Sequence, residues 1–344
     1  MKRPVFSCLL WIAVLLQGEL VFGQDPHFSQ FFSSPLTLNP ALTGKFDGQY
    51  RISGIYRNQW PELNNAFITS SISLDAPILT QKISENNRLA VGIFAMTDKS
   101  VNGILRSNYV AASVAYHIAL DEEGYQQLGA GFQASYANKR LDVAAIKFES
   151  QLDLTGQWTS PSNENFNASL VNVHYIDVNA GLLYNGSTNG LDNYYLGASV
   201  YHLNNPSDGF MKNGNYHLSR RYTAHAGGYF PTGEITTLFL TGLYNQQNTT
   251  KEVVLGSALG FNLAGQSEVP VSFYAGCWTR LNNQYDAVIP YIGLDFNELR
   301  LGLTYDINVS KLTPGSQSKG GMELTLVYVH QKSTGRKTMP CPRF

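Results

Sequence analysis

The chain has 344 residues, a formal net charge of -1 and only 14% charged residues, where soluble domains have roughly a quarter. The near-zero net charge excludes a global electrostatic attraction to nucleic acid or to an anionic lipid surface. A low charge content beside an ordinary hydrophobic content of 43% indicates that much of the surface does not face water.

The first 23 residues have the pattern of a secretory signal peptide. Lys2 and Arg3 precede the apolar run from Cys8 to Leu16, and Gly23 offers a small residue before a cleavage point. The apolar run is too short to span a bilayer. We therefore expect residues 1–23 to be removed and the mature chain to begin at Gln24.

Residues 24–48 form an irregular, aromatic segment that begins "QDPHFSQFFSSPLTLNPALTG". Its prolines exclude a central strand and break any helix, and Asn39-Pro40 favours a turn. Leaving its phenylalanines in water would cost roughly 1.5–3 kcal/mol each relative to burial, so we expect the segment to plug the lower end of a barrel or to contact a periplasmic partner. The candidate contact residues are Asp25, Pro26, Phe28, Phe31, Phe32, Asn39 and Pro40.

Residues 49–332 repeat one pattern, in which segments of alternating apolar and polar residues are separated by turn residues. In "LRLGLTYDIN", for example, Leu301, Leu303 and Tyr305 share a face opposite Gly302 and Thr304. The pattern predicts an all-β transmembrane antiparallel β-barrel of about 14 strands, an even number as in bacterial outer-membrane barrels. The expected strands are 49–60, 65–75, 88–98, 104–120, 125–138, 173–185, 194–204, 219–230, 235–245, 251–264, 269–281, 286–297, 299–309 and 320–332.

The expected connections agree with a barrel whose two termini lie in the periplasm, because periplasmic turns are short and external loops are long. The short turns are 121–124, 231–234 and 297–298, and the long loops are 139–172, 205–218 and 310–319. Connection 76–87 is long for a periplasmic turn and is a second candidate contact surface. A soluble sandwich or propeller is the alternative architecture, but the polar faces contain few Lys and Glu residues and no repeat of fixed period is visible.

The sequence contains no motif for a catalytic, cofactor or metal site. Histidines such as His117, His202 and His225 have no partner at ligand spacing and are interpreted as polar lumen or interface residues. After the leader only Cys277 and Cys341 remain, and a bond between them is left open. We expect a protein that is not an enzyme and binds no cofactor.

Several charged residues occupy positions that the alternation assigns to the lumen. We expect them to pair across the interior, while a role in conduction or binding is the alternative. They are Arg51, Arg57, Asp177, Arg280, Asp295, Arg300 and Asp306.

Both ends of the mature chain resemble one family. The start "QDPHFSQ", followed by a proline and an "NPA" turn that ends in glycine, is similar to the mature N-terminus of the PorP/SprF family. The hairpin "LGLTYDINVSKLTPGSQSKGGMELTLVYV" and the terminal "CPRF", within a tail at 333–344, resemble the last hairpin and tail of that family.

The resemblance implies an outer-membrane component of the type IX secretion system, found in gliding and adhesin-secreting Gram-negative bacteria. It implies a role in the secretion or surface anchoring of a partner adhesin-like cargo with a type B C-terminal sorting domain. Further implied partners are other type IX components, including periplasmic ones linked to peptidoglycan, and the lipid of the outer membrane, but no nucleic acid. The sequence leaves open a small-solute porin or transporter as the alternative function.

Overall fold

The computed structural model describes residues 25–63, 65–79, 83, 86–163, 170–210, 216–263, 270–282, 284–310 and 313–331. The expected signal peptide, the tail at 333–344 and Cys341 lie outside the described residues.

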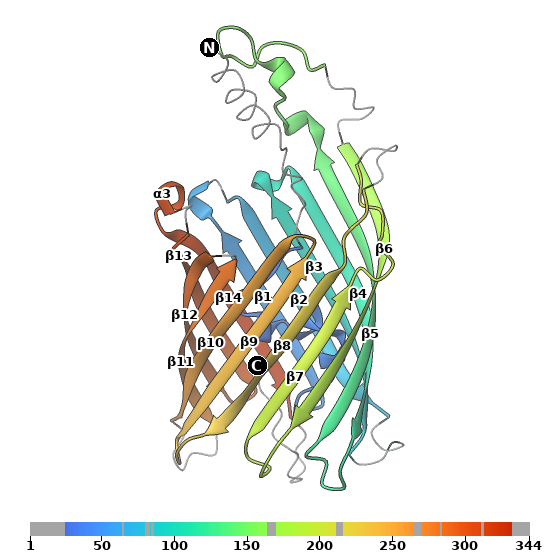
Figure 1. The fold of residues 1–344 in the computed structure, drawn as a ribbon, viewed down its shortest axis with the longest axis vertical. Coiled ribbons are helices and arrows are strands. Elements are labelled where there is room, and N and C mark those ends of the chain that lie inside the picture. Colours follow the sequence, from blue (N-terminus) through green and yellow to red (C-terminus); the bar gives the residue numbers. More distant parts are fainter. Residues whose placement is uncertain are drawn as a thin grey trace, which may run out of the picture.

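Fourteen antiparallel strands form one closed barrel, in which each strand pairs with its sequence neighbour and β1 pairs with β14 (Figure 1). Closure is in register along the whole seam, from Tyr50 opposite His330 to Gln59 opposite Gly321. The strands are β1 Tyr50–Gln59, β2 Phe67–Ile78, β3 Arg88–Ser100, β4 Leu105–Ala119, β5 Gln127–Asp142, β6 Leu170–Gly186, β7 Asn193–Tyr201, β8 Arg221–Pro231, β9 Thr236–Gln247, β10 Thr250–Asn262, β11 Val271–Asn282, β12 Gln284–Phe296, β13 Leu299–Asn308 and β14 Lys319–His330.

Each predicted segment corresponds to one of these strands, and the all-β barrel is confirmed. The reason is visible in β5, where Leu128, Phe132 and Tyr136 are exposed on the outer wall while Gln133 and Ser135 are buried inside. Successive side chains of a strand point to opposite faces, so a wall between lipid and a polar interior produces a strict period of two.

The two ends of the barrel differ in their connections (Figure 1). One end, here the loop end, holds the long connections 143–169, 202–220 and 309–318. The opposite end, here the turn end, holds the start of β1, the end of β14 and short turns such as 232–235.

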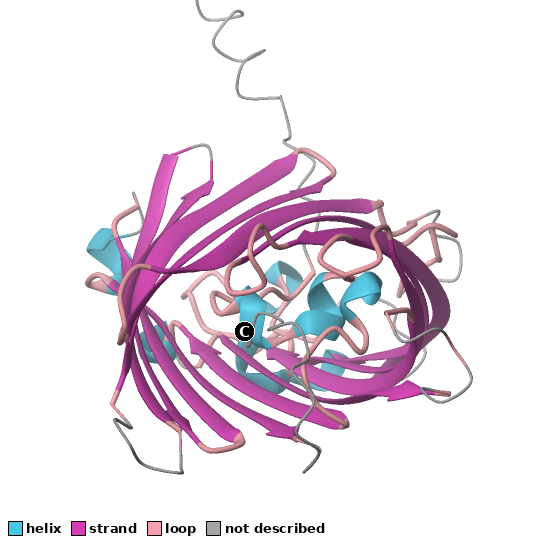
Figure 2. Ribbon diagram, turned by 90° about the horizontal axis from the view of Figure 1, so that it is seen from below, coloured by secondary structure: helices cyan, strands magenta, loops and turns pink. Residues whose placement is uncertain are grey.

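The helices are short, and among the described residues none is long and apolar enough to cross a membrane. Three of them lie inside the ring of strands when the barrel is seen along its axis (Figure 2). These three belong to the N-terminal segment and are η1 Phe31–Ser33, α2 Pro35–Leu38 and η2 Pro40–Leu42. The others lie in connections and are η3 Pro61–Leu63, η4 Val101–Gly103, η5 Val143–Ala145, η6 Glu149–Gln151 and α3 Thr313–Ser316.

Candidate functional site

Residues 25–46, here called the lumen segment, run through the interior of the barrel from the loop end to the turn end. Asp25 contacts the loop-end residues His202 and Gln247, whereas Lys45 contacts Gln127 at the turn-end start of β5. The segment therefore extends beyond the lower end of the barrel that it was expected to plug, because it has polar anchors at both ends and apolar partners between them.

At the loop end, Asp25 is held by charged and polar groups of β7 to β9. Its backbone N–H donates to Gln247 Oε1 at 2.9 Å, and its carboxylate lies 2.8 Å from His202 Nε2 and 3.3 Å from Arg221 Nη1. His202 Nδ1 lies 3.0 Å from Asp177 on β6. Burial alone would lower the pKa of His202, but the carboxylates of Asp25 and Asp177 outweigh it and raise the pKa to about 9. Burial would raise the pKa of Asp25, yet His202 and Arg221 hold it well below its usual range.

Below this anchor, the aromatic side chains of η1 pack against β11 and β12. The ring of Phe32 lies 5.1 Å from Trp278 and 5.8 Å, edge to face, from Tyr291. Phe31 and Phe32 join one buried cluster with Ile289 and neighbouring apolar residues, and Phe28 is buried nearby. These contacts remove from water the aromatic surface that made the segment unsuitable as a linker. Pro26, by contrast, is only partly buried.

The start of η1 is also bound by a buried charge network. Glu323 on β14 accepts hydrogen bonds from the backbone N–H groups of Ser29 at 2.6 Å and Gln30 at 2.7 Å. The same carboxylate pairs with Arg57 on β1. Asp306 on β13 lies 3.0 Å from Arg57 and 2.9 Å from Arg280, and it accepts a bond from the Ser29 hydroxyl at 2.9 Å. Buried charges are tolerated when they are paired and hydrogen-bonded in this way, so the network fixes the segment to the wall.

The Asn39-Pro40 turn fits against glycines of the wall. Asn39 accepts from the backbone of Ala41 at 2.8 Å, which caps η2, and its amide donates to the carbonyl of Leu182 at 3.0 Å. A Cβ at Gly131 would lie 2.4 Å from the backbone carbon of Pro40, and a Cβ at Gly181 would lie 1.9 Å from Asn39 Oδ1. The lack of side chains at these glycines therefore admits the turn.

The turn-end anchor is an ion pair between Arg51 on β1 and Asp75 on β2, which are 2.8 Å apart. Asp75 also accepts the backbone N–H of Gly44 at 2.7 Å, while Arg51 donates to the carbonyl of Leu42 at 3.1 Å. Gly44 has a φ of +70°, which favours glycine, and its carbonyl accepts from Arg88 at 2.9 Å.

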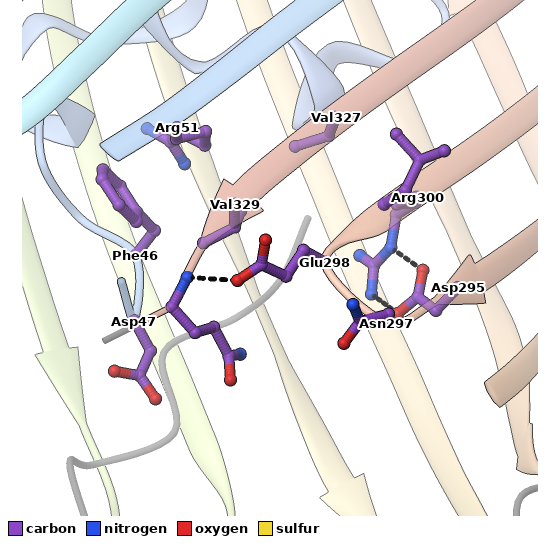
Figure 3. Close-up of a pocket in the computed structure, with 11 residues that line it drawn as sticks. Phe46, Asp47, Arg51, Asp295, Asn297, Glu298, Arg300, Val327 and Val329 are labelled. Atoms are coloured by element: carbon purple, nitrogen blue, oxygen red, sulfur yellow. Dashed lines mark hydrogen bonds and ion pairs between the residues drawn. The ribbon is translucent and has the colours of Figure 1, made fainter. Parts of the chain in front are cut away.

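A recess of about 450 Å³ of empty space opens beside this anchor (Figure 3). Phe46, Val327 and Val329 form its apolar side. Glu298, in the β12–β13 turn, accepts the backbone N–H of Gln331 at 2.8 Å, and Arg300 pairs with Asp295 on the neighbouring strand at one side of the recess (Figure 3). The Gln331 N–H and the Tyr328 hydroxyl lower the pKa of Glu298. Arg51, Asp295, Glu298 and Arg300 at its rim each have a charged or hydrogen-bonding partner.

The structure pairs all seven candidate lumen charges, either with each other or with residues that the sequence reading did not select. Three such partners are Asp75, Glu323 and His202. The alternation does assign Glu323 to the lumen, since Met322 and Leu324 on either side face outward. His202 follows a strand, where the alternation no longer applies. Among the described residues no group of acidic, His and Cys side chains could hold a metal ion.

The comparisons with known proteins decide the family. The model of the type IX secretion system membrane protein PorP/SprF matches residues 20–328. The chain belongs to the PorP/SprF family. The proteins of this family are membrane components of a secretion system, and the family is not an enzyme family. As a closed barrel of this family, the chain is an outer-membrane protein.

Solved structures resemble this PorP/SprF protein only in general architecture. A FadL homologue of Pseudomonas aeruginosa is 11% identical with a TM-score of 0.46, covering 90% of this chain and 95% of its own. A TodX monoaromatic hydrocarbon channel mutant is 10% identical with a TM-score of 0.46, covering 86% and 94%. BamA from Haemophilus ducreyi is 10% identical with a TM-score of 0.40, covering 82% and 70%. Curated proteins give no match in sequence. At TM-scores below 0.5, these likenesses carry no inference about what the chain binds.

Proposed function

We propose that this PorP/SprF protein serves the secretion or surface anchoring of a partner adhesin-like cargo with a type B C-terminal sorting domain. The observation that carries the proposal is the lumen segment, which occupies the interior from end to end and is fixed by buried ion pairs. A barrel filled in this way offers its two ends as binding surfaces rather than its interior as a passage, which argues against a small-solute porin or transporter. In this arrangement the loop end faces the cell exterior and the turn end faces the periplasm.

The connection 143–163 is the best-formed candidate surface for cargo. Asp153 accepts hydrogen bonds from the backbone of Thr155 at 2.8 Å and Gln157 at 2.9 Å, and from the hydroxyl of Thr159 at 2.7 Å. Hydrogen bonds from Thr155 and Thr159 lower the pKa of this carboxyl. The ordered turn leaves Leu154 and Trp158 exposed. Exposed apolar side chains on a preorganised loop are typical of a protein-binding surface.

The recess at the turn end is the corresponding candidate for other type IX components, including periplasmic ones linked to peptidoglycan. Its apolar floor and paired charges lie next to the point where the lumen segment enters β1 (Figure 3). A partner bound there would contact the segment and the wall together.

Surface display of cargo in a deletion strain tests the proposal. The gene is deleted and complemented with the wild type, with the double variant Leu154→Ser and Trp158→Ser, or with Val309→Ser, a matched change at an exposed apolar residue of another loop-end connection. We expect display to be lost on deletion, restored by the wild type and by Val309→Ser, and reduced at least severalfold by the double variant at equal barrel levels. Unchanged display of every candidate adhesin in the deletion strain would refute the cargo role.

A further inference from the structure

Three basic side chains form a row across neighbouring strands near the loop end. Lys99 on β3 is directly opposite Arg106 on β4, and Arg106 is directly opposite Arg140 on β5. Their strand positions place all three on the outer wall, since Asp98 and Ser107 beside Lys99 and Arg106 are buried inside. Arg140 is exposed and lies an even number of residues after the outward-facing Tyr136. The wall therefore carries three positive charges at directly paired positions of three neighbouring strands.

This row has no acidic partner among the described residues. Within the described part of the chain, Arg106 Nε donates a hydrogen bond to the carbonyl of Gly103 at 3.3 Å. Like charges directly opposite each other on paired strands destabilise a sheet. Arg is suited to bidentate binding of phosphate, so an anionic ligand would remove the repulsion and use all three donors.

The outward-facing rows of paired residues on the turn-end side of the basic row indicate where the basic row lies relative to the lipid. The adjacent row is polar and consists of Thr97, Asn108, Asn138 and His174. The row after that is Ala95, Val110, Tyr136 and Ile176, and it belongs to the exposed apolar band. Along a strand, two residues correspond to about 7 Å, so the basic row lies about 14 Å of strand beyond the last apolar row. From the interior of a membrane to its surface, the hydrocarbon layer is followed by a polar layer and then by an anionic layer. The apolar, polar and basic rows follow in the same order.

The polar row presents a further donor toward the same ligand. His174 Nδ1 lies 2.9 Å from the Tyr136 hydroxyl and 2.8 Å from Asn138 Nδ2, both of which can donate. With Nδ1 accepting, the ring proton is on Nε2. The stacked ring of Tyr136 fixes the orientation of the imidazole. An Nε2–H donor one row from Arg140 matches a headgroup that carries both sugar hydroxyls and phosphate.

We infer that the outer wall of β3 to β6 binds the phosphorylated headgroup of an outer-leaflet glycolipid, with Lys99, Arg106 and Arg140 on phosphate and His174 on the sugar region. The inference rests on the loop end facing outward, as in the proposed function, but not on the cargo role. The rest of the wall offers a control, because Lys251, at the loop-end start of β10, is a single basic side chain opposite the neutral Gln246.

Binding of lipid A to the purified full-length barrel in nanodiscs tests the inference. The probes are bisphosphorylated lipid A, chemically dephosphorylated lipid A and inorganic phosphate. The variants are the triple change Lys99→Gln, Arg106→Gln and Arg140→Gln, the single change Arg106→Gln, and the control Lys251→Gln. Heat-modifiable migration on gels confirms that each variant is a folded barrel.

We expect the triple variant to bind lipid A at least tenfold more weakly, Arg106→Gln to bind severalfold more weakly, and Lys251→Gln to bind as the wild type does. Without lipid A, the triple variant should unfold at the same or a higher denaturant concentration than the wild type, because repulsion is removed. Equal binding by wild type and triple variant, or equal binding of dephosphorylated lipid A, would overturn the inference. So would inorganic phosphate at equal concentration displacing the lipid. A loss of cargo display while lipid A binding stays intact would bear on the proposed function and would leave the lipid inference standing.

Discussion

Glu323 shows how single residues fix the lumen segment. One carboxylate accepts two backbone N–H groups at the start of η1 and pairs with Arg57, and all of these groups are buried. Water cannot replace a lost partner there, so the contribution of this residue exceeds that of a surface ion pair.

Glu323→Ala should therefore destabilise the barrel strongly. It leaves two backbone donors and part of the Arg57 charge unpaired in a buried site, which costs about 3–5 kcal/mol of unfolding free energy. The matched control is Glu62→Ala, which breaks the Lys319–Glu62 pair at 2.7 Å, where the two side chains are 42% and 54% exposed. That change should have a much smaller effect, because water screens an exposed ion pair. Urea unfolding in lipid vesicles measures both, and equal effects would contradict the anchoring role of Glu323.

The loop-end anchor should depend on pH through His202. Its pKa is about 9 in the fold, above the ordinary histidine value of 6.5, so its contribution to stability is fully present below pH 6.5 and is lost as pH rises through 9. The groups facing it are Asp25, Asp177 and, through Asp25, Arg221. The wild type should be more stable than His202→Gln by about 2–3 kcal/mol near neutrality, and this gap should narrow by pH 10.5. Unfolding curves of both proteins at the two pH values test this, and a gap that stays constant would count against a charged His202.

At the scale of elements, η2 packs closely against the wall because Gly131 on β5 and Gly181 on β6 have no side chain at the contact. A Cβ on Gly131 would lie 2.4–2.5 Å from backbone atoms of Pro40 and Ala41, and backbone cannot move aside as a flexible side chain can. The fit of the turn therefore depends on two strands far along the chain.

Gly131→Ala should displace η2 and lower the unfolding free energy by about 1–3 kcal/mol, the usual cost of overpacking. Gly54→Ala is the matched control, because the nearest atom to a Cβ on Gly54 in β1 would be the carbonyl oxygen of Leu326 at 3.9 Å. Thermal unfolding followed by gel migration compares the two. Identical midpoints for Gly131→Ala and wild type would show that the turn does not pack against Gly131 as described.

The strands were predictable from sequence because a lipid-facing wall forces apolar residues to every second position, as in Leu301, Leu303 and Tyr305 of β13. The burial of Phe31 and Phe32 follows from their apolar area, but their partners Trp278 and Tyr291 are distant in sequence and are brought together only by barrel closure. For the same reason, the direction of the lumen segment could not be predicted. No sequence pattern marks His202 as a partner of Asp25, because it is the first residue after β7 and lies outside the alternating positions of the strand.

At the scale of the whole molecule, the barrel and its lumen segment form one unit in which a wall closed from β1 to β14 surrounds a segment bound at both ends. The segment is joined directly to β1, so any force on its turn-end portion acts on the seam of the barrel. With the interior filled, the surfaces left exposed are the two ends and the outer wall.

Conductance in planar lipid bilayers tests the filled lumen most directly. The mature protein is compared with a form that lacks residues 25–46, and heat-modifiable migration confirms that both are folded barrels. The account predicts no large, stable channel for the intact protein and an open channel after the deletion. A large, stable channel in the intact protein would contradict a lumen closed by its own N-terminal segment and would favour a porin.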